Sequence, residues 1–336
     1  MKKFDLSTLL LDWYARNGRD LPWRIKGGAH PDPYVILVSE LMLQQTTVKT
    51  VIPYFKRFME RFPTVFELAA ADLDEVYQYW QGLGYYSRAR SLHAAARTIS
   101  GEFNGIFPQT REQVLRLKGI GPYTAASLLA LGFNLPETVI DGNVIRVICR
   151  LFHLTRPTNE IMNLIKEKAA ALTSKRHPAD YASAIMDLGA VVCTPKNPQC
   201  LICPWQRHCL SCGQTDLELI PARPQTAKKE KHGVVYIITN AAGQVLIRKR
   251  TEKGLLSGLW EFPWSDDEKT LRPEAEDSGL SVTHVFTHFK LNLKICTSDE
   301  HQNYPDGQFV SPRDFPNYAF STLMKKVWHK FSRTTN

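Results

Sequence analysis

The spacing of hydrophobic positions along the chain changes once, near residue 214. Before that point, apolar side chains recur every three or four residues, the spacing that gathers them on one face of a helix. The clearest segments of this kind are 114–117, 125–131 and 144–152. Turn-forming pairs separate the helical segments, at Asn17-Gly18, Gly27-Gly28, Phe62-Pro63, Asn104-Gly105 and Phe107-Pro108. This part of the chain is therefore predicted to be mainly α-helical.

Shorter apolar runs follow from residue 232 onward and have the length and composition of strands. The first two runs are joined by a turn at 240–243 and have the pattern of a β-hairpin. The predicted elements are strands at 234–239, 245–247, 285–289 and 291–295, and a closing helix at 321–331 that Ser321 caps. This part of the chain is predicted to be α+β.

Three segments of different character follow from these patterns. We expect a helical domain over 1–213, a linker over 214–231 and a smaller α+β domain over 232–336. Two prolines and a charged run at 228–231 indicate that the linker is extended. A chain of 336 residues is long enough to bury two sizeable cores.

Charge and hydropathy limit the class of protein. The net charge is +9, and residues 1–215 hold 25 Lys and Arg against 18 Asp and Glu. A basic helical domain suits a polyanion such as DNA, although a charge that serves only solubility explains this number equally well. No run approaches the ~20 apolar residues of a membrane span, and the first residues lack the pattern of a secretory signal. We therefore expect a cytoplasmic protein without a membrane partner.

Four of the seven cysteines form one cluster, with the spacing Cys193-x6-Cys200-x2-Cys203-x5-Cys209. In a cytoplasmic chain such a cluster indicates a metal site rather than disulfides. Four thiolates in this window suit either tetrahedral zinc or a [4Fe–4S] cluster. The other cysteines lie outside the pattern, and we interpret them as buried or incidental thiols: Cys149, Cys212 and Cys296.

Three further positions have chemistry of their own. Gly119 and Gly121 flank a turn between two helical segments, where glycines let backbone N–H groups converge on a phosphate. Asp141 stands where a later helix begins, and its simplest role is that of a helix N-cap. Glu40 lies among apolar residues, so its burial should raise its pKa into the range that a general acid needs.

These segments together resemble the MutY-type adenine DNA glycosylases of the helix-hairpin-helix, endonuclease III-like superfamily. The resemblance covers nearly the whole chain and is strongest at 21–24, 39–48, 82–90, 117–125 and 139–147. It implies a mainly α helix-hairpin-helix glycosylase domain with a [4Fe–4S] cluster loop. Residues 254–263 resemble the Nudix-related domain that recognises 8-oxoguanine in these enzymes.

The implied activity is base excision repair. The enzyme would be a monofunctional, monomeric glycosylase of the cytoplasm and its nucleoid. It would remove adenine opposite 8-oxoguanine or guanine in duplex DNA. By resemblance Glu40 protonates the adenine, Asp141 stabilises the oxocarbenium-like sugar, and Tyr123 and Asn143 hold this pair. The four clustered cysteines would bind the iron.

The resemblance also assigns DNA and base contacts. They fall on Arg24, Gln45, Thr46, Leu83, Tyr85, Gly119, Gly121, Ser183, Thr287 and His288. Tyr85 would wedge beside the lesion and help offset the cost of unstacking. Ser183 departs from the family, because Gln or Glu commonly stands there and contacts adenine. Serine is too short for the same bond, so either water bridges the gap or recognition of the leaving base differs.

Two other functions are alternatives, and a third fails for lack of metal carboxylates. A bifunctional, endonuclease III-like glycosylase/lyase for oxidised pyrimidines would need a lysine two residues after Gly121, where this chain has Tyr123. A non-catalytic iron–sulfur DNA-binding protein would not need both Glu40 and Asp141. Nucleotide hydrolysis by the second domain would need a carboxylate-rich helix for magnesium, and Glu274, Glu276 and Asp277 lack that spacing.

Overall fold

A computed structural model describes residues 5–25, 30–222, 229–252, 254–270, 275–286, 288–298 and 304–334. The chain forms two compact units. Unit 1 consists of Met1–Ala70 and Ser91–Gln225, and unit 2 of Ala71–Arg90 and Thr226–Asn336. Among the described residues, no helix has both the length and the apolar character needed to cross a membrane. The boundaries of the three predicted segments, 1–213, 214–231 and 232–336, stay a prediction.

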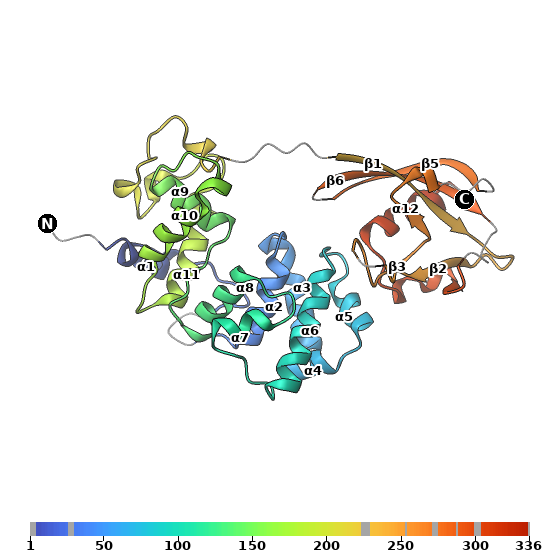
Figure 1. Ribbon diagram of the computed structural model, residues 1–336, viewed down its shortest axis with the longest axis horizontal. Coiled ribbons are helices and arrows are strands. Elements are labelled where there is room, and N and C mark those ends of the chain that lie inside the picture. The colour runs from blue at the N-terminus through green and yellow to red at the C-terminus, as the bar shows by residue number, and fades with distance from the viewer. Residues whose placement is uncertain are drawn as a thin grey trace. The chain divides into compact units, whose positions relative to one another are not determined.

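Unit 1 is helical, as the spacing of apolar residues predicts (Figure 1). Its α-helices are α1 (Leu6–Asn17), α2 (Pro33–Leu43), α3 (Val48–Arg61), α4 (Val65–Ala70), α7 (Arg111–Arg116), α8 (Pro122–Ser127), α9 (Gly142–Leu151), α10 (Thr158–Leu172) and α11 (Pro178–Asp187). Helix α6 (Ser87–Glu102) spans the division between the units. Helix α2 is apolar on all sides and is buried over most of its length, so it forms the centre of the unit.

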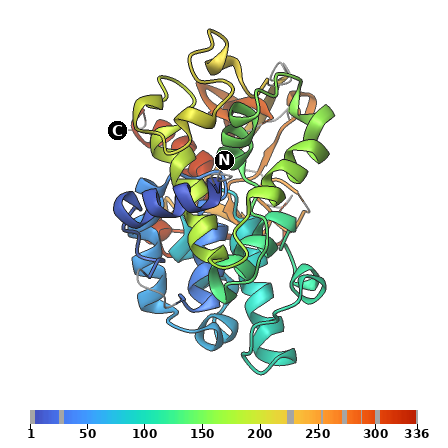
Figure 2. The same cartoon turned by 90° about the vertical axis from the view of Figure 1, so that its left-hand side faces the viewer.

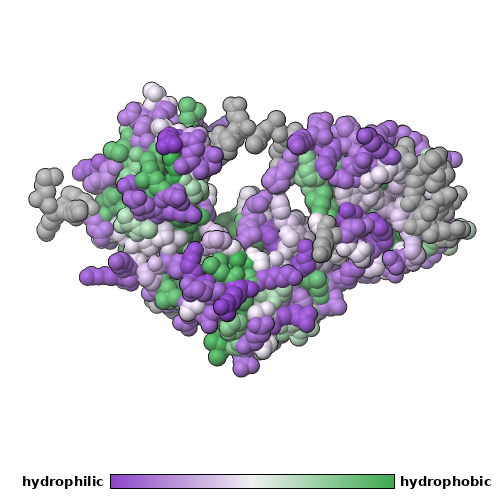
Figure 3. Space-filling view, in the orientation of Figure 1, coloured by the Kyte–Doolittle hydropathy of each residue, from purple (hydrophilic) through white to green (hydrophobic). Residues whose placement is uncertain are grey.

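Short helical turns extend this scaffold. Single π-helical turns, η1 (Leu128–Gly132) and η2 (Leu188–Val192), continue α8 and α11, and such turns are frequent at functional sites. The 3-10 turns η3 (Cys200–Ile202), η4 (Gln206–His208) and η5 (Leu217–Leu219) follow in the segment after α11. This segment, yellow in Figures 1 and 2, lies at one end of α9 and α10. Hydrophobic patches lie among hydrophilic side chains on the surface of unit 1 (Figure 3).

Unit 2 contains two β-sheets. The strands are β1 (Lys229–Ile238), β2 (Val245–Lys249), β3 (Trp260–Glu261), β4 (Trp264–Ser265), β5 (Glu276–Val285), β6 (Phe289–Ser298) and β7 (Gly307–Val310). They form one sheet in the order β4-β1-β6-β5 and a second in the order β3-β2-β7. The helices are α5 (Leu73–Trp80) and α12 (Thr322–Ser332), with 3-10 turns η6 (Glu268–Thr270) and η8 (Pro312–Asn317).

The predicted hairpin over 234–247 is wrong, because its two strands belong to different sheets. Strand β1 pairs in parallel with β6, and only an isolated bridge joins Thr239 to Val245. The burial of β1 explains why it does not form a simple hairpin with β2. The second half of β1, from Gly233 to Ile238, is buried on both faces, as in a central strand with a neighbour on each side.

The predicted strand over 285–289 is wrong as well. Strand β5 ends at Val285 and β6 begins at Phe289, and the Phe286 amide donates to the Phe289 carbonyl at 2.8 Å to close the turn. The alternation of apolar and polar residues continues through this turn, so the sequence pattern does not distinguish the turn from a strand. Strand β5 escaped prediction because it lies at a sheet edge and most of its side chains are exposed or half-buried.

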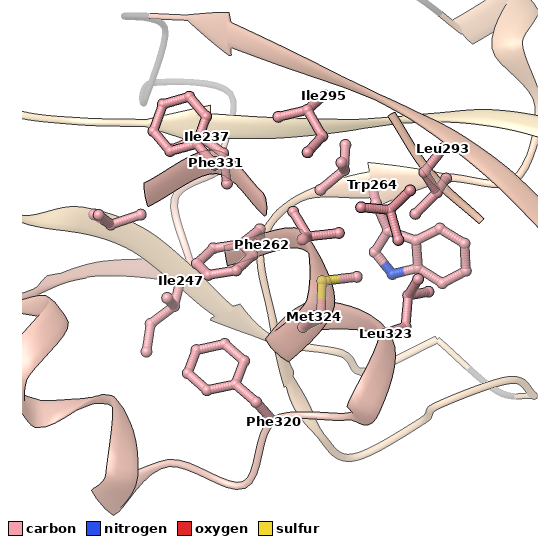
Figure 4. Packing of buried hydrophobic residues seen from close by; sticks show 14 of the residues in the cluster. Ile237, Ile247, Phe262, Trp264, Leu293, Ile295, Phe320, Leu323, Met324 and Phe331 are labelled. Carbon is pink, nitrogen blue, oxygen red and sulfur yellow. The ribbon is translucent and has the colours of Figure 1, made fainter. Parts of the chain in front are cut away.

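Helix α12 packs its apolar face onto the sheets of unit 2. Figure 4 shows Leu323, Met324 and Phe331 of this helix against side chains of β1, β2 and β6, among them Ile237, Ile247 and Ile295. The Ser321 hydroxyl accepts a hydrogen bond from the Met324 amide at 3.2 Å, which confirms the predicted cap.

Candidate active site and cluster loop

One cleft of unit 1, about 1120 Å³ in volume, gathers most of the predicted site residues. Helices α2, α8, α9 and α11 and the loops before α2 and α3 contribute to its lining. The predicted residues that line it are Arg24, Glu40, Gln45, Thr46, Gly119, Gly121, Tyr123, Asp141, Asn143 and Ser183. The structure thus brings Glu40 and Asp141, far apart in sequence, into the same cleft.

Glu40 is almost fully buried on α2, with 4% of its surface exposed. Burial raises the pKa of its carboxyl group, and the nearby Asp141 raises it further. The hydroxyls of Tyr123 and Ser127 and the charge of Arg24 act in the opposite direction. Within the described part of the chain, Oε2 forms no hydrogen bond of good geometry. Burial therefore makes this carboxyl group hold its proton more strongly than an exposed glutamate does, as a general acid requires.

Asp141 is held by hydrogen bonds on both carboxylate oxygens. It caps α9, because Oδ1 accepts from the Val144 amide at 2.7 Å, while Oδ2 accepts from Nδ2 of Asn143 at 2.9 Å. The predicted N-cap role of Asp141 is therefore confirmed. This capping role is compatible with a role in the cleft, because Asp141 also lines the cleft. A fixed carboxylate at this point can stabilise a developing positive charge.

Tyr123 and Ser183 form another part of the cleft wall. Burial raises the pKa of Tyr123 well above its ordinary value, and Glu40 and Asp141 add to the shift, so its hydroxyl stays a proton donor. That hydroxyl lies 3.8 Å from the sulfur of Met186. Ser183, on α11, is buried with 6% exposed and brings a short hydroxyl to the wall.

Asp187 is a residue of this region that sequence reasoning missed. It is fully buried at the end of α11, and its two oxygens accept hydrogen bonds from Arg24 at 2.8 and 2.9 Å. Arg19 donates to the same carboxylate through its backbone amide and Nε. Burial alone would raise the pKa of Asp187, but the two arginines hold that pKa below its ordinary value. The sequence does contain a signal for Asp187, because it is a carboxylate inside the mainly apolar stretch 181–189.

The glycine turn has the geometry that its sequence requires. Gly119 has φ +78, and a Cβ added there would lie 2.1 Å from Oγ of Ser91, so both the backbone and the packing demand glycine. Gly121 caps α8, and Pro122 occupies the first turn of that helix. Gln45 also has a positive φ, of 57, and its side chain is exposed beside the cleft.

The cluster loop, residues 193–209, is tied to α9 by Arg150. This side chain is 1% exposed and donates to the carbonyls of Thr194, Pro195 and Ile220 at 2.6, 2.9 and 2.9 Å. It also lies 3.6 Å from the sulfur of Cys193. Trp205 anchors the other side of the loop through a 2.8 Å bond from its indole to the Leu6 carbonyl. The loop is therefore held by the helical core.

The thiols of this loop suit an iron–sulfur cluster. Burial raises the pKa of Cys203 to about 12, and the thiols of Cys193, Cys209 and Cys200 contribute, so the sulfurs lie near one another. Across the described residues, no three His, Cys, Asp or Glu side chains lie close enough to hold a single metal ion. In a [4Fe–4S] cluster each of four cysteines binds a different iron, and the loop offers four cysteines.

Comparison with known proteins identifies both units. The HhH-GPD superfamily base excision DNA repair protein family matches residues 38–171, and the iron-sulfur binding domain of endonuclease III matches 193–209. A NUDIX domain matches residues 234–330. The adenine DNA glycosylase of Rattus norvegicus is 32% identical over 96% of this chain and 77% of its own length. The chain belongs to the adenine DNA glycosylase family.

Two further matches agree. The adenine DNA glycosylase of Buchnera aphidicola subsp. Baizongia pistaciae is 36% identical over 86% of this chain and 82% of its own. A solved structure of a thermostable thymine-DNA glycosylase superposes with a TM-score of 0.55 and 27% identity, covering 61% of this chain and 94% of that one. The chain is thus a DNA N-glycosylase of base excision repair with a [4Fe–4S] cluster loop and a Nudix-like domain.

The remaining predicted residues of this glycosylase lie in unit 2. Leu83 is buried, with 6% exposed, whereas Tyr85 has a positive φ of 48 and is 45% exposed. His288 is exposed at the turn between β5 and β6, and Thr287 lies outside the described residues. Tyr85 and Phe286 line one cavity of about 280 Å³ in this unit. The loop at 82–86 and the turn after β5 therefore lie together.

The Nudix-like domain of this glycosylase uses its buried carboxylate for structure. Glu261 is 1% exposed and accepts hydrogen bonds from Arg248, Arg250 and the indole of Trp264 at 3.1, 3.3 and 2.6 Å. Burial raises the pKa of Glu261, and the two arginines oppose the shift. A carboxylate occupied in this way is a poor candidate for holding magnesium.

Proposed function

We propose that this chain excises adenine opposite 8-oxoguanine or guanine in duplex DNA and leaves an abasic site without cutting the strand. One observation carries the proposal. The buried Glu40, with its raised pKa, and the hydrogen-bonded Asp141 line the same cleft. The names of the relatives, adenine DNA glycosylases, support adenine as the leaving base.

The two carboxyl groups divide the chemistry. Glu40, whose pKa burial raises, gives its proton to a ring nitrogen of adenine, which makes the base a better leaving group. As the glycosidic bond breaks, Asp141 stabilises the positive charge on the sugar. Tyr123 and Asn143 hold the pair, and Asn143 does so through its bond to Asp141. Cys193, Cys200, Cys203 and Cys209 would hold a [4Fe–4S] cluster, which would help to fix the loop against the helical core.

DNA contacts come from the rim of the same cleft. The turn at Gly119 and Gly121 presents backbone N–H groups where α8 begins, a suitable place for a phosphate. Gln45 and Thr46 enter the opened duplex near the extruded base. Arg24 contacts the base from the position that Asp187 fixes.

Unit 2 reads the base opposite the adenine. The cavity that Tyr85 and Phe286 line supports this role, because it places the exposed Tyr85 ring next to the turn that follows β5. His288 lies in that turn, and Thr287 precedes it in the sequence. We further propose that the enzyme acts as a monomer at the DNA of the cytoplasm. Its seven cysteines, all within the described residues, form no disulfide bonds, as a reducing compartment favours.

The test is single-turnover excision from duplexes that contain adenine opposite 8-oxoguanine, guanine, cytosine or thymine, with thymine opposite guanine and thymine glycol opposite adenine as rivals. Release of adenine from the first two duplexes, and little else, is expected. Faster release of thymine or thymine glycol would overturn the choice of substrate.

The reading role of unit 2 has its own test. His288→Ala and Tyr85→Ala should reduce excision opposite 8-oxoguanine more than excision opposite guanine. His329→Ala, an exposed histidine on α12, is the matched control and should leave the ratio unchanged. Equal losses on both duplexes would contradict the role.

A further inference from the structure

The loop 82–86 carries Tyr85 in a backbone conformation that a bulky side chain does not favour. Gly82 and Gly84 have φ +110 and +71, values that suit glycine. Tyr85 follows with φ +48, in the left-handed region that bulky residues rarely adopt. Such a conformation persists only where the surrounding structure enforces it, and conformations of this kind cluster at functional sites. The residues that enforce it therefore bear on what Tyr85 does.

Arg88, in the first turn of α6, is one source of this constraint. It is buried, with 6% of its surface exposed, and its Nη2 donates to the carbonyls of Leu83 and Gly84 at 3.2 and 3.1 Å. The indole of Trp80 donates to the same Gly84 carbonyl at 3.1 Å. That carbonyl belongs to the planar peptide group that precedes Tyr85. Two donors therefore fix the direction in which the chain enters Tyr85.

The guanidinium group of Arg88 also contacts the side chain of Tyr85. Its Cζ lies 5.4 Å from the centre of the Tyr85 ring and 5.5 Å from the centre of the Trp80 ring. Both distances are within the ~6 Å over which a cation attracts an aromatic face. Burial lowers the pKa of Arg88 to about 10, which still leaves the guanidinium charged at neutral pH. Tyr85 is thus held by its backbone and by its ring, while 45% of its surface stays exposed.

We propose that Arg88, together with Trp80, positions the Tyr85 ring for insertion into the duplex. This role rests on the wedge function proposed above for Tyr85. Inserting a side chain that is already fixed costs less conformational entropy than ordering a free loop on the DNA. Arg88 is therefore a positioning residue that promotes extrusion of the adenine, and it takes no part in breaking the glycosidic bond.

The test measures unstacking separately from chemistry, in duplexes with adenine opposite 8-oxoguanine. A 2-aminopurine next to the adenine brightens when the stack opens, and single-turnover assays give the rate of base release. Arg88→Met removes the donors and the charge but keeps an unbranched side chain, so it should give a smaller fluorescence rise and about tenfold slower release. Arg97→Met, which changes an exposed arginine further along α6, is the matched control and should behave like the parent.

A second duplex separates positioning from damage to the active site. When the pairs that flank the adenine are also mismatched, the stack is open beforehand and the wedge has little to do. Arg88→Met should release adenine from this duplex at the parental rate. Equally slow release from both duplexes would overturn the proposal.

Combination with Tyr85→Ala shows whether Arg88 acts through the wedge. Tyr85→Ala alone should slow release, and adding Arg88→Met should slow it no further. If Tyr85→Ala behaves like the parent in both assays, the wedge role is wrong and the positioning role falls with it. If Tyr85→Ala is slow and Arg88→Met is as fast as the parent, or if the two losses add, only the positioning role is wrong. Should Arg88→Met fail to fold, Trp80→Phe removes the indole donor but keeps an aromatic ring, and a parental fluorescence rise in that variant would overturn the proposal.

Discussion

Arg146 joins the N-terminal end of α9, where Asp141 and Asn143 lie, to the backbone of Cys193. Its Nε donates to the Cys193 carbonyl at 2.7 Å, and its Nη2 donates to Oδ1 of Asn143 at 2.9 Å. Asn143 in turn donates to Asp141. Gly189 lies against this chain of bonds, since a Cβ there would come within 2.7 Å of Cβ of Asn143. One buried side chain therefore ties the carboxylate of the cleft to a cluster cysteine.

Replacing Arg146 should affect both ends of this link. In Arg146→Gln the shorter side chain cannot reach both Asn143 and Cys193, so we expect about tenfold slower base release and faster loss of iron on dilution into a chelator. Arg156→Gln, which changes an exposed arginine on the neighbouring segment, is the control. Parental rates for both readouts in Arg146→Gln would show that the link has no functional role.

Glu40→Gln should abolish rapid base release. The amide keeps the shape of the side chain but cannot act as the acid, so a loss on the order of 10²–10⁴-fold is expected under single-turnover conditions. Duplex affinity, measured by fluorescence anisotropy, should change little. Glu60→Gln, an exposed position on α3, should behave like the parent. Cleavage by Glu40→Gln at the parental rate would refute the assignment.

The burial of Glu40 should also appear in the pH dependence of stability. Its pKa is raised in the folded state, so the folded protein holds this proton more tightly than the unfolded chain does. The Glu40 contribution to the unfolding free energy is therefore present below the unfolded pKa and is lost as the pH rises through the folded pKa. Glu40→Gln should consequently gain stability relative to the parent as the pH rises from the ordinary carboxyl range toward neutral, measured by urea unfolding. A constant difference over this range would contradict the burial of a protonated carboxyl.

Asp187→Asn should destabilise unit 1. The substitution removes the charge that pairs with Arg19 and Arg24, and breaking a buried pair on one side costs about 3 kcal/mol. Because the pKa of Asp187 is lowered, its contribution is present at neutral pH and is lost as the pH falls through the folded pKa. The difference from the parent should therefore shrink in acid. Asp180→Asn, an exposed aspartate of α11, should have little effect on urea unfolding.

Borohydride should trap the enzyme poorly on its DNA. A lyase attacks the sugar with a lysine amine, whereas Tyr123 occupies the expected position and Lys118 is outside the cleft lining. Within the described residues, Lys49 is the lysine that lines the cleft, so any slow trapping should disappear in Lys49→Ala. Efficient trapping at the rate of base release, in the parent and in Lys49→Ala alike, would refute the monofunctional mechanism.

The sequence contained the local features of the site. Gly119 is required by its own backbone angle, Asp141 caps the helix that follows it, and the cysteine spacing belongs to one short loop. Such features depend on neighbours within a few residues, so a linear pattern is enough to find them. The burial of Glu40 was also predictable, because the apolar residues around it in sequence are those of α2 itself.

By itself, then, the sequence determined the helical and α+β parts of the chain, the glycine turn and the side chains available for chemistry. The tertiary structure decided which partners those side chains meet. Arg24 and Asp187 are 163 residues apart, Arg146 reaches Cys193 across 47, and β1 pairs with β6 rather than with β2. Hydrophobic spacing indicates which face of an element is buried. It does not indicate which other element covers that face, because many partners would bury the same apolar area equally well. The pairing is settled only when the whole core packs and each buried polar group finds its bond.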